Sequence, residues 1–373
     1  MAPKRPKGAG ALERKLKTAL SPAPAPSRSN ELYAALDLGT NSCRMLIAEP
    51  KGGGFHVVDS FSKSVQLGAG LEKTGRLSRG SMARTIQALR ICQQKLRRHR
   101  VKRMRLVATE ACRRALNGAD FMRRITRETG LRLDIIEPEQ EAQLAVISCA
   151  PLVSPKTENL LVVDIGGGST ELVWIDISHV PPIDRPQAIM RLHGGFDQAR
   201  STIPQAKVVD WISVPLGVAT LRDQFNDVED DAARFALMSW FFEENLTDFT
   251  PYQSAQPQER FQIVGTSGTV TTVAASHLGL RRYDRTKVDG LRMTSQQIDK
   301  VIHTYLAMGP AGRRADPCIG QDRSALIMSG AAILQALMRC WPTDRLSVAD
   351  RGLREGLLYA QMSADGVLDE GTF

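Results

Sequence analysis

The sequence predicts an α/β protein made of two domains with a cleft between them. The chain has 373 residues, of which 42% are hydrophobic, and this is enough for two domains that each bury a core. Apolar strands alternate with segments of helical periodicity, which is typical of α/β layers. A strand–turn–strand unit near the start recurs in the middle of the chain, which indicates two halves of similar construction.

The secondary structure of the first half follows from its hydrophobic pattern. A buried strand begins at Leu32, passes through a tight glycine turn and continues as a second strand at 45–48. Residues 82–96 keep one face apolar at helical spacing, and Ser78 or Ser81 is the expected N-cap of that helix. The next elements are expected to be a strand at 105–108, a helix at 120–129 and a strand at 133–136.

Composition sets the expected domain boundaries. Residues 1–30 mix basic residues with Gly and Pro, so we expect a flexible basic tail, although its composition is also similar to that of a transit peptide. We expect a first domain at 31–146 and a second at 147–350, with a final helix at about 351–373 that packs on the first domain. A long stretch at 175–210 is either a flap over the cleft or a surface decoration.

The charge balance argues against a nucleic-acid-binding protein. The net charge is +9, but residues 1–30 carry seven Lys/Arg and one Glu, so the rest of the chain carries only about +3. A basic cluster at 95–105 either steers a polyanion or is a solvated helix end. The six cysteines and six histidines show no metal-site spacing, which favours a reduced cytoplasm. No run approaches eighteen apolar residues, so we expect a soluble protein that does not bind membranes.

The repeated unit carries the first candidate site. In each copy an Asp closes a buried strand, a Gly permits a tight turn, and small polar residues leave the N–H groups of the turn free to bind an anion. Asp37 and Asp164 would repel a phosphate, so their expected role is to hold Mg²⁺ directly or through water. The residues expected to bind phosphate are Gly39, Thr40, Asn41, Ser42, Gly166, Gly167, Gly168 and Ser169.

A third segment places Gly and hydroxyl residues at the start of a helix. An expected strand at 261–264 precedes it and an expected helix at 270–276 follows, and helix N-termini bind anions. A simple capped turn is the alternative. The candidates in this segment are Gly265, Ser267 and Gly268. Three better-known motifs do not fit. The segment at 68–74 lacks one residue of the P-loop, that at 166–171 lacks one of the dinucleotide fingerprint, and that at 265–269 lacks one of the hydrolase elbow.

Six segments, taken in chain order, indicate a particular protein family. Together, the segments at 37–42, 108–115, 141–142, 164–172, 265–269 and 353–359 resemble those of the exopolyphosphatase / guanosine pentaphosphate phosphohydrolase family, over residues 32–360. The resemblance implies two ribonuclease H-like domains of the actin-like superfamily. It also implies hydrolysis of the terminal phosphoanhydride of inorganic polyphosphate, dependent on Mg²⁺ or another divalent cation, by a homodimer.

The resemblance implies roles for single residues. Glu141 would orient the attacking water, although its position alone indicates only an acidic first turn of a helix. Arg113 would bind a terminal phosphate through its bidentate guanidinium. Glu171 would help Asp37 and Asp164 to hold the metal, unless it is a solvated residue at the start of a strand.

The chain departs from the family at two positions near these residues. The family usually has two adjacent acidic residues where this chain has Gln140 before Glu141, and Glu139 is a possible substitute if the register differs. Cys43 follows the first turn where the family tends to have an aromatic residue. We expect Cys43 to be a small buried hydrophobic residue rather than a nucleophile.

Three other functions compete with the exopolyphosphatase prediction. A guanosine pentaphosphate (pppGpp) 5′-phosphohydrolase attacks the same type of bond, and the sequence does not separate the two. A sugar or carboxylate kinase would share the turns, but no acceptor signature is evident. A sensor that binds guanosine penta- or tetraphosphate without hydrolysis is kept open by Gln140. The chain ends fourteen residues after Tyr359, as in the short form of the family, which implies a preference for short polyphosphates.

Overall fold

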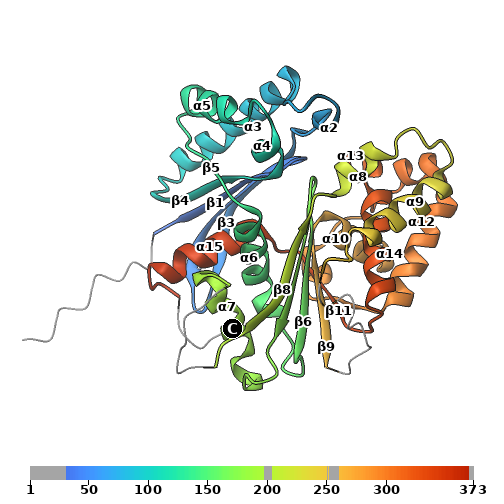
Figure 1. The fold of residues 1–373 in the computed structure, drawn as a ribbon. Coiled ribbons are helices and arrows are strands. Elements are labelled where there is room, and N and C mark those ends of the chain that lie inside the picture. The colour runs from blue at the N-terminus through green and yellow to red at the C-terminus, as the bar shows by residue number, and fades with distance from the viewer. Residues whose placement is uncertain (1–30, 197–203, 250, 252–259, 369–373) are drawn as a thin grey trace, which may run out of the picture.

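The computed structural model describes residues 31–196, 204–249, 251 and 260–368, which form two mixed β-sheets with helices packed against them (Figure 1). The tail expected at 1–30 lies outside the described residues. Within the described part, no helix is long and apolar enough to cross a membrane.

The first sheet contains five strands in the order β3-β2-β1-β4-β5. Its elements are β1 (Tyr33–Leu38), β2 (Ser42–Lys51), β3 (Gly54–Ser64), α2 (Leu71–Thr74), α3 (Arg79–Arg98), β4 (Arg103–Ala108), α4 (Glu110–Arg114), α5 (Gly118–Thr129) and β5 (Asp134–Ile135). Alternate residues of β1 face opposite sides of the sheet, and Leu36 and Leu38 join the core under α3 and α5. Tyr33 and Ala35 belong to a second core on the other side.

The second sheet contains six strands in the order β10-β11-β9-β6-β7-β8. Its strands are β6 (Asn159–Ile165), β7 (Thr170–Asp176), β8 (Lys207–Val214), β9 (Phe261–Thr266), β10 (Arg292–Met293) and β11 (Leu346–Ala349). The largest core packs one face against α8 (Val218–Gln224), α9 (Asp231–Glu244), α10 (Gly268–His277), α12 (Ser295–Ala315) and α14 (Ile327–Cys340). Two short helices, α11 (Arg285–Val288) and α13 (Gln321–Ser324), connect these elements.

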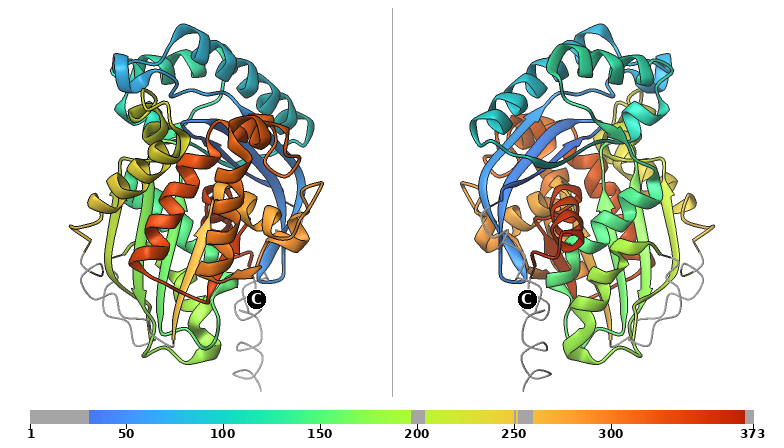
Figure 2. Two further views of the ribbon diagram at one scale, coloured as in Figure 1. Left: turned by 90° about the vertical axis from the view of Figure 1, so that its right-hand side faces the viewer. Right: turned by 90° about the vertical axis from the view of Figure 1, so that its left-hand side faces the viewer.

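Two helices, α6 (Pro138–Cys149) and α15 (Leu353–Ala364), form a layer that both sheets share. α15 packs along α6 and also contacts β1 and β2, while α6 contacts β6 and β7. Figure 1 and the right-hand view of Figure 2 show this pair between the two sheets, and α7 (Arg185–Arg191) packs against α6. The same buried cluster includes Ala35 of the first sheet and Val162 of the second, so α6 and α15 connect the two halves through apolar contacts.

The repeat predicted from the sequence is confirmed by the strand order. β1 pairs antiparallel with β2 and parallel with β4, and β6 pairs in the same way with β7 and β9. The run β3-β2-β1-β4-β5 therefore corresponds to β8-β7-β6-β9-β11. The expected helix at 82–96 is the central part of α3, and Ser78 is its N-cap because its side chain accepts the Ser81 N–H. The edge strand β3 was not predicted.

The close packing of α15 on α6 yields a stability prediction. A Cβ atom at Gly356 would overlap the carbonyl oxygen of Leu144 and lie 2.8 Å from its carbonyl carbon. We expect Gly356→Ala to lower the free energy of unfolding by about 2 kcal/mol, because backbone atoms must move to relieve the overlap. Urea unfolding measures this effect. Gly80→Ala at an exposed position of α3 is the control, since its Cβ meets only the end of Arg84, and it should not destabilise the protein. Equal stabilities of both variants would contradict the packing described here.

Candidate active site

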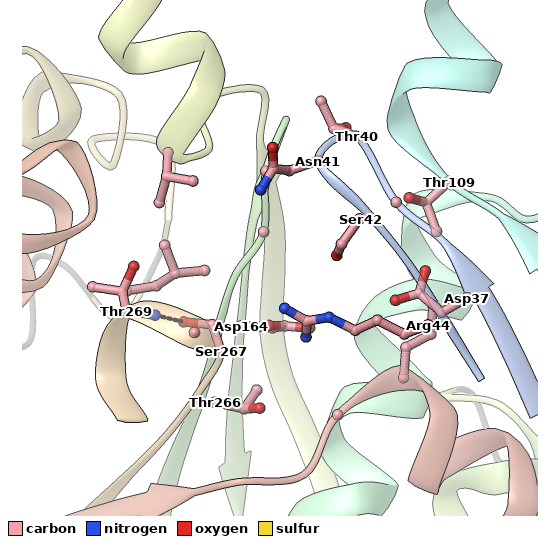
Figure 3. A pocket seen from close by; sticks show the side chains of 18 of the residues that line it. Asp37, Thr40, Asn41, Ser42, Arg44, Thr109, Asp164, Thr266, Ser267 and Thr269 are labelled. Carbon is pink, nitrogen blue, oxygen red and sulfur yellow. Dashed lines mark hydrogen bonds between the residues drawn. The ribbon is translucent and has the colours of Figure 1, made fainter. Parts of the chain in front are cut away.

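A cleft with a volume of about 330 Å³ opens where the two repeated turns meet (Figure 3). Its walls come from the carboxyl ends of β1, β6 and β9, from the first turns of α6 and α10, and from residues 349–354. Strand carboxyl ends are where α/β sheets usually place their ligands. Most of the predicted site residues line the cleft, namely Asp37, Gly39, Thr40, Asn41, Ser42, Glu141, Asp164, Gly166, Gly167, Gly168, Ser169, Ser267 and Gly268.

The first turn, between β1 and β2, is closed by one backbone hydrogen bond. The N–H of Gly39 donates to the carbonyl of Ser42 over 3.0 Å. The carbonyl of Asn41 accepts the N–H groups of residues 65 and 66, and the carbonyl of Thr40 accepts that of Gly68. Since the protein itself engages these carbonyls, the turn can offer N–H groups and hydroxyls to an anion.

The second turn, between β6 and β7, is built in the same way. The N–H of Gly166 donates to the carbonyl of Ser169 over 2.9 Å, and residues 218 and 219 at the start of α8 donate to the carbonyls of Gly166 and Gly167. A Cβ atom at Gly217 would lie 2.6 Å from the nitrogen of Gly168. Glycine at 217 therefore allows α8 to approach the turn closely enough to hold its carbonyls.

The two turns touch each other. A Cβ atom at Gly168 would lie 2.7 Å from Thr40 Oγ1 and 2.8 Å from Glu110 Cγ, and one at Gly167 would lie 3.1 Å from Thr40 Cβ. These separations are shorter than ordinary van der Waals contacts, so a side chain at 168 would require Thr40 and Glu110 to shift, and one at 167 would press on Thr40. The turns that the sequence repeat singled out therefore lie on the two sides of one cleft.

The Asp residues that close the two strands share a desolvated space. Desolvation raises the pKa of Asp37, and it raises the pKa of Asp164 to about 6 with a further contribution from the charge of Asp37. Desolvation, and next the charge of Asp164, raises the pKa of Glu171 to about 8. The hydroxyls of Ser169 and Ser213 donate to Glu171 Oε1 and partly offset this. Glu171 is buried behind Ser169 and does not line the cleft.

Glu141 lies in the first turn of α6, and its side chain lines the cleft. Desolvation, and next the charge of Glu171, raises its pKa well above the usual value. Its Oε2 lies 3.5 Å from Arg113 Nη1 but accepts no hydrogen bond from the described residues. Arg113 itself does not line the cleft, because its guanidinium donates to the carbonyl of Ile136 and to Glu110 Oε2. The structure thus places Arg113 behind Glu141.

Arg44 is a cleft residue that the sequence analysis missed. It extends from β2 into the space between Asp37 and Asp164 (Figure 3). Desolvation lowers its pKa, and the charges of both Asp residues counteract this. The signal was the register of the hairpin. A turn at 39–42 makes Asp37 and Arg44 cross-strand partners on one face, as Asp164 and Glu171 are in the second copy.

The third predicted segment forms the start of α10. Ser267 caps this helix by accepting the Thr269 N–H, and it adopts a left-handed φ of 122°, which is rare for residues other than glycine. Ser267 and Gly268 line the cleft, whereas Gly265 is buried in β9 and does not. Arg323 Nη1 donates to Thr272 Oγ1, which keeps a cation beside the helix start.

The structure decides two alternatives that the sequence left open. Glu139 is exposed and does not line the cleft, so Glu141 is the acidic residue of α6 that reaches it. None of the described residues of 175–210 lines the cleft either, and α7 packs against α6. The flap interpretation is therefore not supported for this part of the stretch.

Cys43 is fully buried, which confirms the expectation of a small hydrophobic residue.

The carboxylates of the cleft could hold a divalent cation only together with other ligands. Among the described residues, no three His, Cys, Asp or Glu side chains are grouped so that they alone could hold a metal ion. Mg²⁺ commonly takes one or two carboxylates and completes its shell with water and phosphate oxygens. Asp37 and Asp164 fit this arrangement, because desolvated carboxylates with raised pKa values gain most from a neighbouring cation.

Comparisons with known proteins identify similar chains. The model of the Ppx/GppA phosphatase family matches residues 46–365. The guanosine-5′-triphosphate,3′-diphosphate pyrophosphatase of Aeromonas salmonicida (strain A449) is 28% identical over 335 residues, which cover 89% of this chain and 59% of the relative. The corresponding protein of Aeromonas hydrophila subsp. hydrophila gives the same values. The chain therefore spans 59% of the length of these two relatives.

The fold of this chain is similar to that of solved structures. The crystal structure of the Aquifex aeolicus Ppx/GppA family member is 30% identical, covers 90% of this chain and 98% of its own, and has a TM-score of 0.69. An exopolyphosphatase from Cytophaga hutchinsonii ATCC 33406 is 20% identical, covers 92% of this chain and 100% of its own, and has a TM-score of 0.74. The second similarity concerns the fold alone. Together they confirm the actin-like fold expected from the sequence.

The raised pKa of Glu171 predicts a pH dependence of stability without divalent cations. A raised pKa means that the folded protein binds more protons than the unfolded chain between the usual pKa of 4.5 and about 8. The free energy of unfolding should fall as the pH rises through this window. Glu171→Gln removes this ionisable group, so the stability of the variant relative to wild type should be higher at pH 9 than at pH 5 by about 4 kcal/mol. Urea unfolding at both pH values measures this, with exposed Glu244→Gln as the control. Parallel behaviour of all three proteins would contradict the shift.

Proposed function

Because the chain belongs to the Ppx/GppA phosphatase family, we propose that it hydrolyses phosphoanhydride bonds and that its main substrate is inorganic polyphosphate. Each turnover would consume one water and release orthophosphate from the end of the polymer. The observation that carries this proposal is the position of Glu141. It is a desolvated carboxylate, poised beside two turns that can bind phosphate, with one oxygen that accepts no hydrogen bond from the described residues.

The proposed roles follow from the chemistry of phosphoryl transfer. Catalysis requires positive charge around the phosphoryl oxygens and a group that orients the attacking water. The turns at 39–42 and 166–169 would bind the terminal phosphates through N–H groups and hydroxyls, and Arg44 would add a guanidinium between them. Glu141 would accept the proton of the water as the new P–O bond forms and the anhydride bond breaks. Arg113 would position Glu141 from behind.

The cofactor is part of this proposal. Asp37 and Asp164 would hold Mg²⁺ or another divalent cation together with the phosphates, and Glu171 would act on the site by orienting Ser169. When bound, the cation would screen the negative charge of phosphates and carboxylates. Without it, repulsion between these groups would oppose substrate binding, so chelation of divalent cations is expected to abolish turnover.

A second candidate function is the hydrolysis of pppGpp at its 5′-phosphate. It is favoured by the names of the two Aeromonas relatives, which are guanosine-5′-triphosphate,3′-diphosphate pyrophosphatases. The third candidate is a non-hydrolytic sensor that binds guanosine penta- or tetraphosphate. The three differ in a simple observable. The first two release orthophosphate from different substrates, and the sensor binds without releasing any.

Replacement of Glu141 tests the proposed reaction. We expect Glu141→Gln to lower orthophosphate release from polyphosphate at least about hundredfold while binding persists, because an amide cannot accept the proton of the water. In wild type, kcat/KM should rise as the pH passes through the raised pKa of Glu141. Exposed Glu139→Gln is the matched control and should keep wild-type turnover. If wild type binds substrate but releases no orthophosphate, the sensor function replaces the proposal.

Substrate profiling separates the polymer from the nucleotide. We expect a higher kcat/KM for tripolyphosphate than for pppGpp, and a higher value for short than for long polyphosphates. The reason is that the cleft, at about 330 Å³, has room for few phosphates. Orthophosphate release at matched concentrations of each compound measures this. A higher kcat/KM for pppGpp would select the second candidate, and equal or faster turnover of long chains would contradict the length preference.

A further inference from the structure

A second basic depression lies in the second half of the molecule, away from the cleft. We propose that it is an anion site that binds an oligophosphate. It consists of two adjoining cavities of about 670 and 110 Å³, both lined by Lys156 and Arg345. We call it the basic groove and define it by its five cations, which are Lys156, Arg185, Arg260, Arg292 and Arg345.

Three of these cations converge where no described carboxylate is present. Lys156, Arg292 and Arg345 line the smaller cavity, whose other described lining residues are uncharged. Within the described part of the chain, Lys156 and Arg292 form no ion pair, and Arg345 only approaches the highly exposed Asp344 at 3.7 Å. Cations that repel each other without a counter-charge favour binding of an anion.

The floor of the basic groove is fixed by Gln262, which is 2% exposed. Its Oε1 accepts the N–H of Ser154 and the hydroxyl of Thr157, and its Nε2 donates to the carbonyl of Leu152 and to Ser347 Oγ. This single amide therefore joins the loop that carries Lys156 to β11. A buried polar group with all its hydrogen bonds made holds its surroundings in one arrangement, so the site is preformed.

The positions of Arg292, Arg185 and Arg260 follow from their contacts with this framework and with the loops beside it. Arg292 on β10 is the cross-strand partner of Ser347 on β11, so its side chain lies on the same face as the floor. Buried Arg185 donates to the carbonyl of Pro155 over 2.5 Å, which ties down the loop beside Lys156. Arg260 is exposed and pairs with Glu158. The basic groove thus has a rigid wall and a more exposed rim.

The basic groove and the cleft are separate sites. No residue lines both of them. Gln262 is near the amino end of β9, whereas Thr266 at its carboxyl end lines the cleft. Four residues of extended strand span about 13 Å. An anion bound in the basic groove would therefore not contact Glu141.

The lining residues select the class of anion. Arg guanidinium groups match the geometry of phosphate oxygens, and several cations spread over two adjoining cavities suit a chain of phosphates better than a single one. No aromatic side chain lines either cavity, so a stacking platform for nucleobases is absent from the described lining. These features favour an inorganic oligophosphate over a nucleic acid.

Calorimetric titration with tripolyphosphate in EDTA tests the proposal, because it counts binding sites under conditions in which we expect no hydrolysis. Because repulsion by the cleft carboxylates opposes binding there without a cation, wild type should bind one equivalent, in the basic groove. The double variant Lys156→Gln/Arg345→Gln should bind it at least about tenfold more weakly. The control Lys51→Gln/Arg132→Gln makes the same charge change at exposed positions and should bind one equivalent with wild-type affinity.

Each alternative result has a defined meaning. No binding to wild type, or binding of wild-type affinity to the double variant, would overturn the basic groove as an anion site. If the double variant fails to fold, Arg292→Gln at the sheet edge replaces it with the same expectation. Tighter binding of a short DNA, lost in the same variant, would overturn the oligophosphate class. Orthophosphate release with Mg²⁺ is measured separately, so an inactive protein that still binds tripolyphosphate in the basic groove would refute the proposed function and leave the basic groove intact.

Discussion

The structure depends on the contact between the turns that follow Asp37 and Asp164, which come from different sheets. Gly167 and Gly168 lie so close to Thr40 that a side chain at either position would require Thr40 to shift. Because the turns touch, Asp37 and Asp164 enter one desolvated space, where desolvation raises the pKa of both and the charge of Asp37 raises that of Asp164 further. Arg44 offsets part of this cost from within the cleft. A cation and an array of phosphate oxygens would complete the charge balance, which is why the geometry supports a phosphoanhydride hydrolase.

The shared helix layer connects this contact to the proposed chemistry. α6 carries Glu141 at its start and packs with α15 between the two sheets, so the carboxylate is fixed relative to both turns. Arg113 pairs with Glu141 and also with Glu110, which lines the cleft as well. A group that must orient water benefits from such support, since small displacements in a catalytic site cost large factors in rate.

Local sequence patterns predicted most of the fold. The contacts between segments that are distant in sequence became evident only in the structure. The repeat of Asp and Gly between apolar strands located both turns, and Ser78 correctly marked the start of α3. Edge strand β3 escaped because none of its residues is buried and its apolar residues do not follow its alternating exposure, since Val58 is exposed and Asp59 is half-buried. Arg44 was missed although the hairpin register could have placed it beside Asp37. The position of Arg113 behind Glu141, and the basic groove, arise from side chains far apart in sequence, and local spacing carries no signal for them.

The most direct test of the account is a crystal structure of the protein with orthophosphate and Mg²⁺. The account predicts a phosphate between residues 39–42 and 166–169, with Arg44 and the Glu141 carboxylate beside it. A phosphate bound elsewhere with the cleft empty, or turns that are separated so that Glu141 faces solvent, would contradict it.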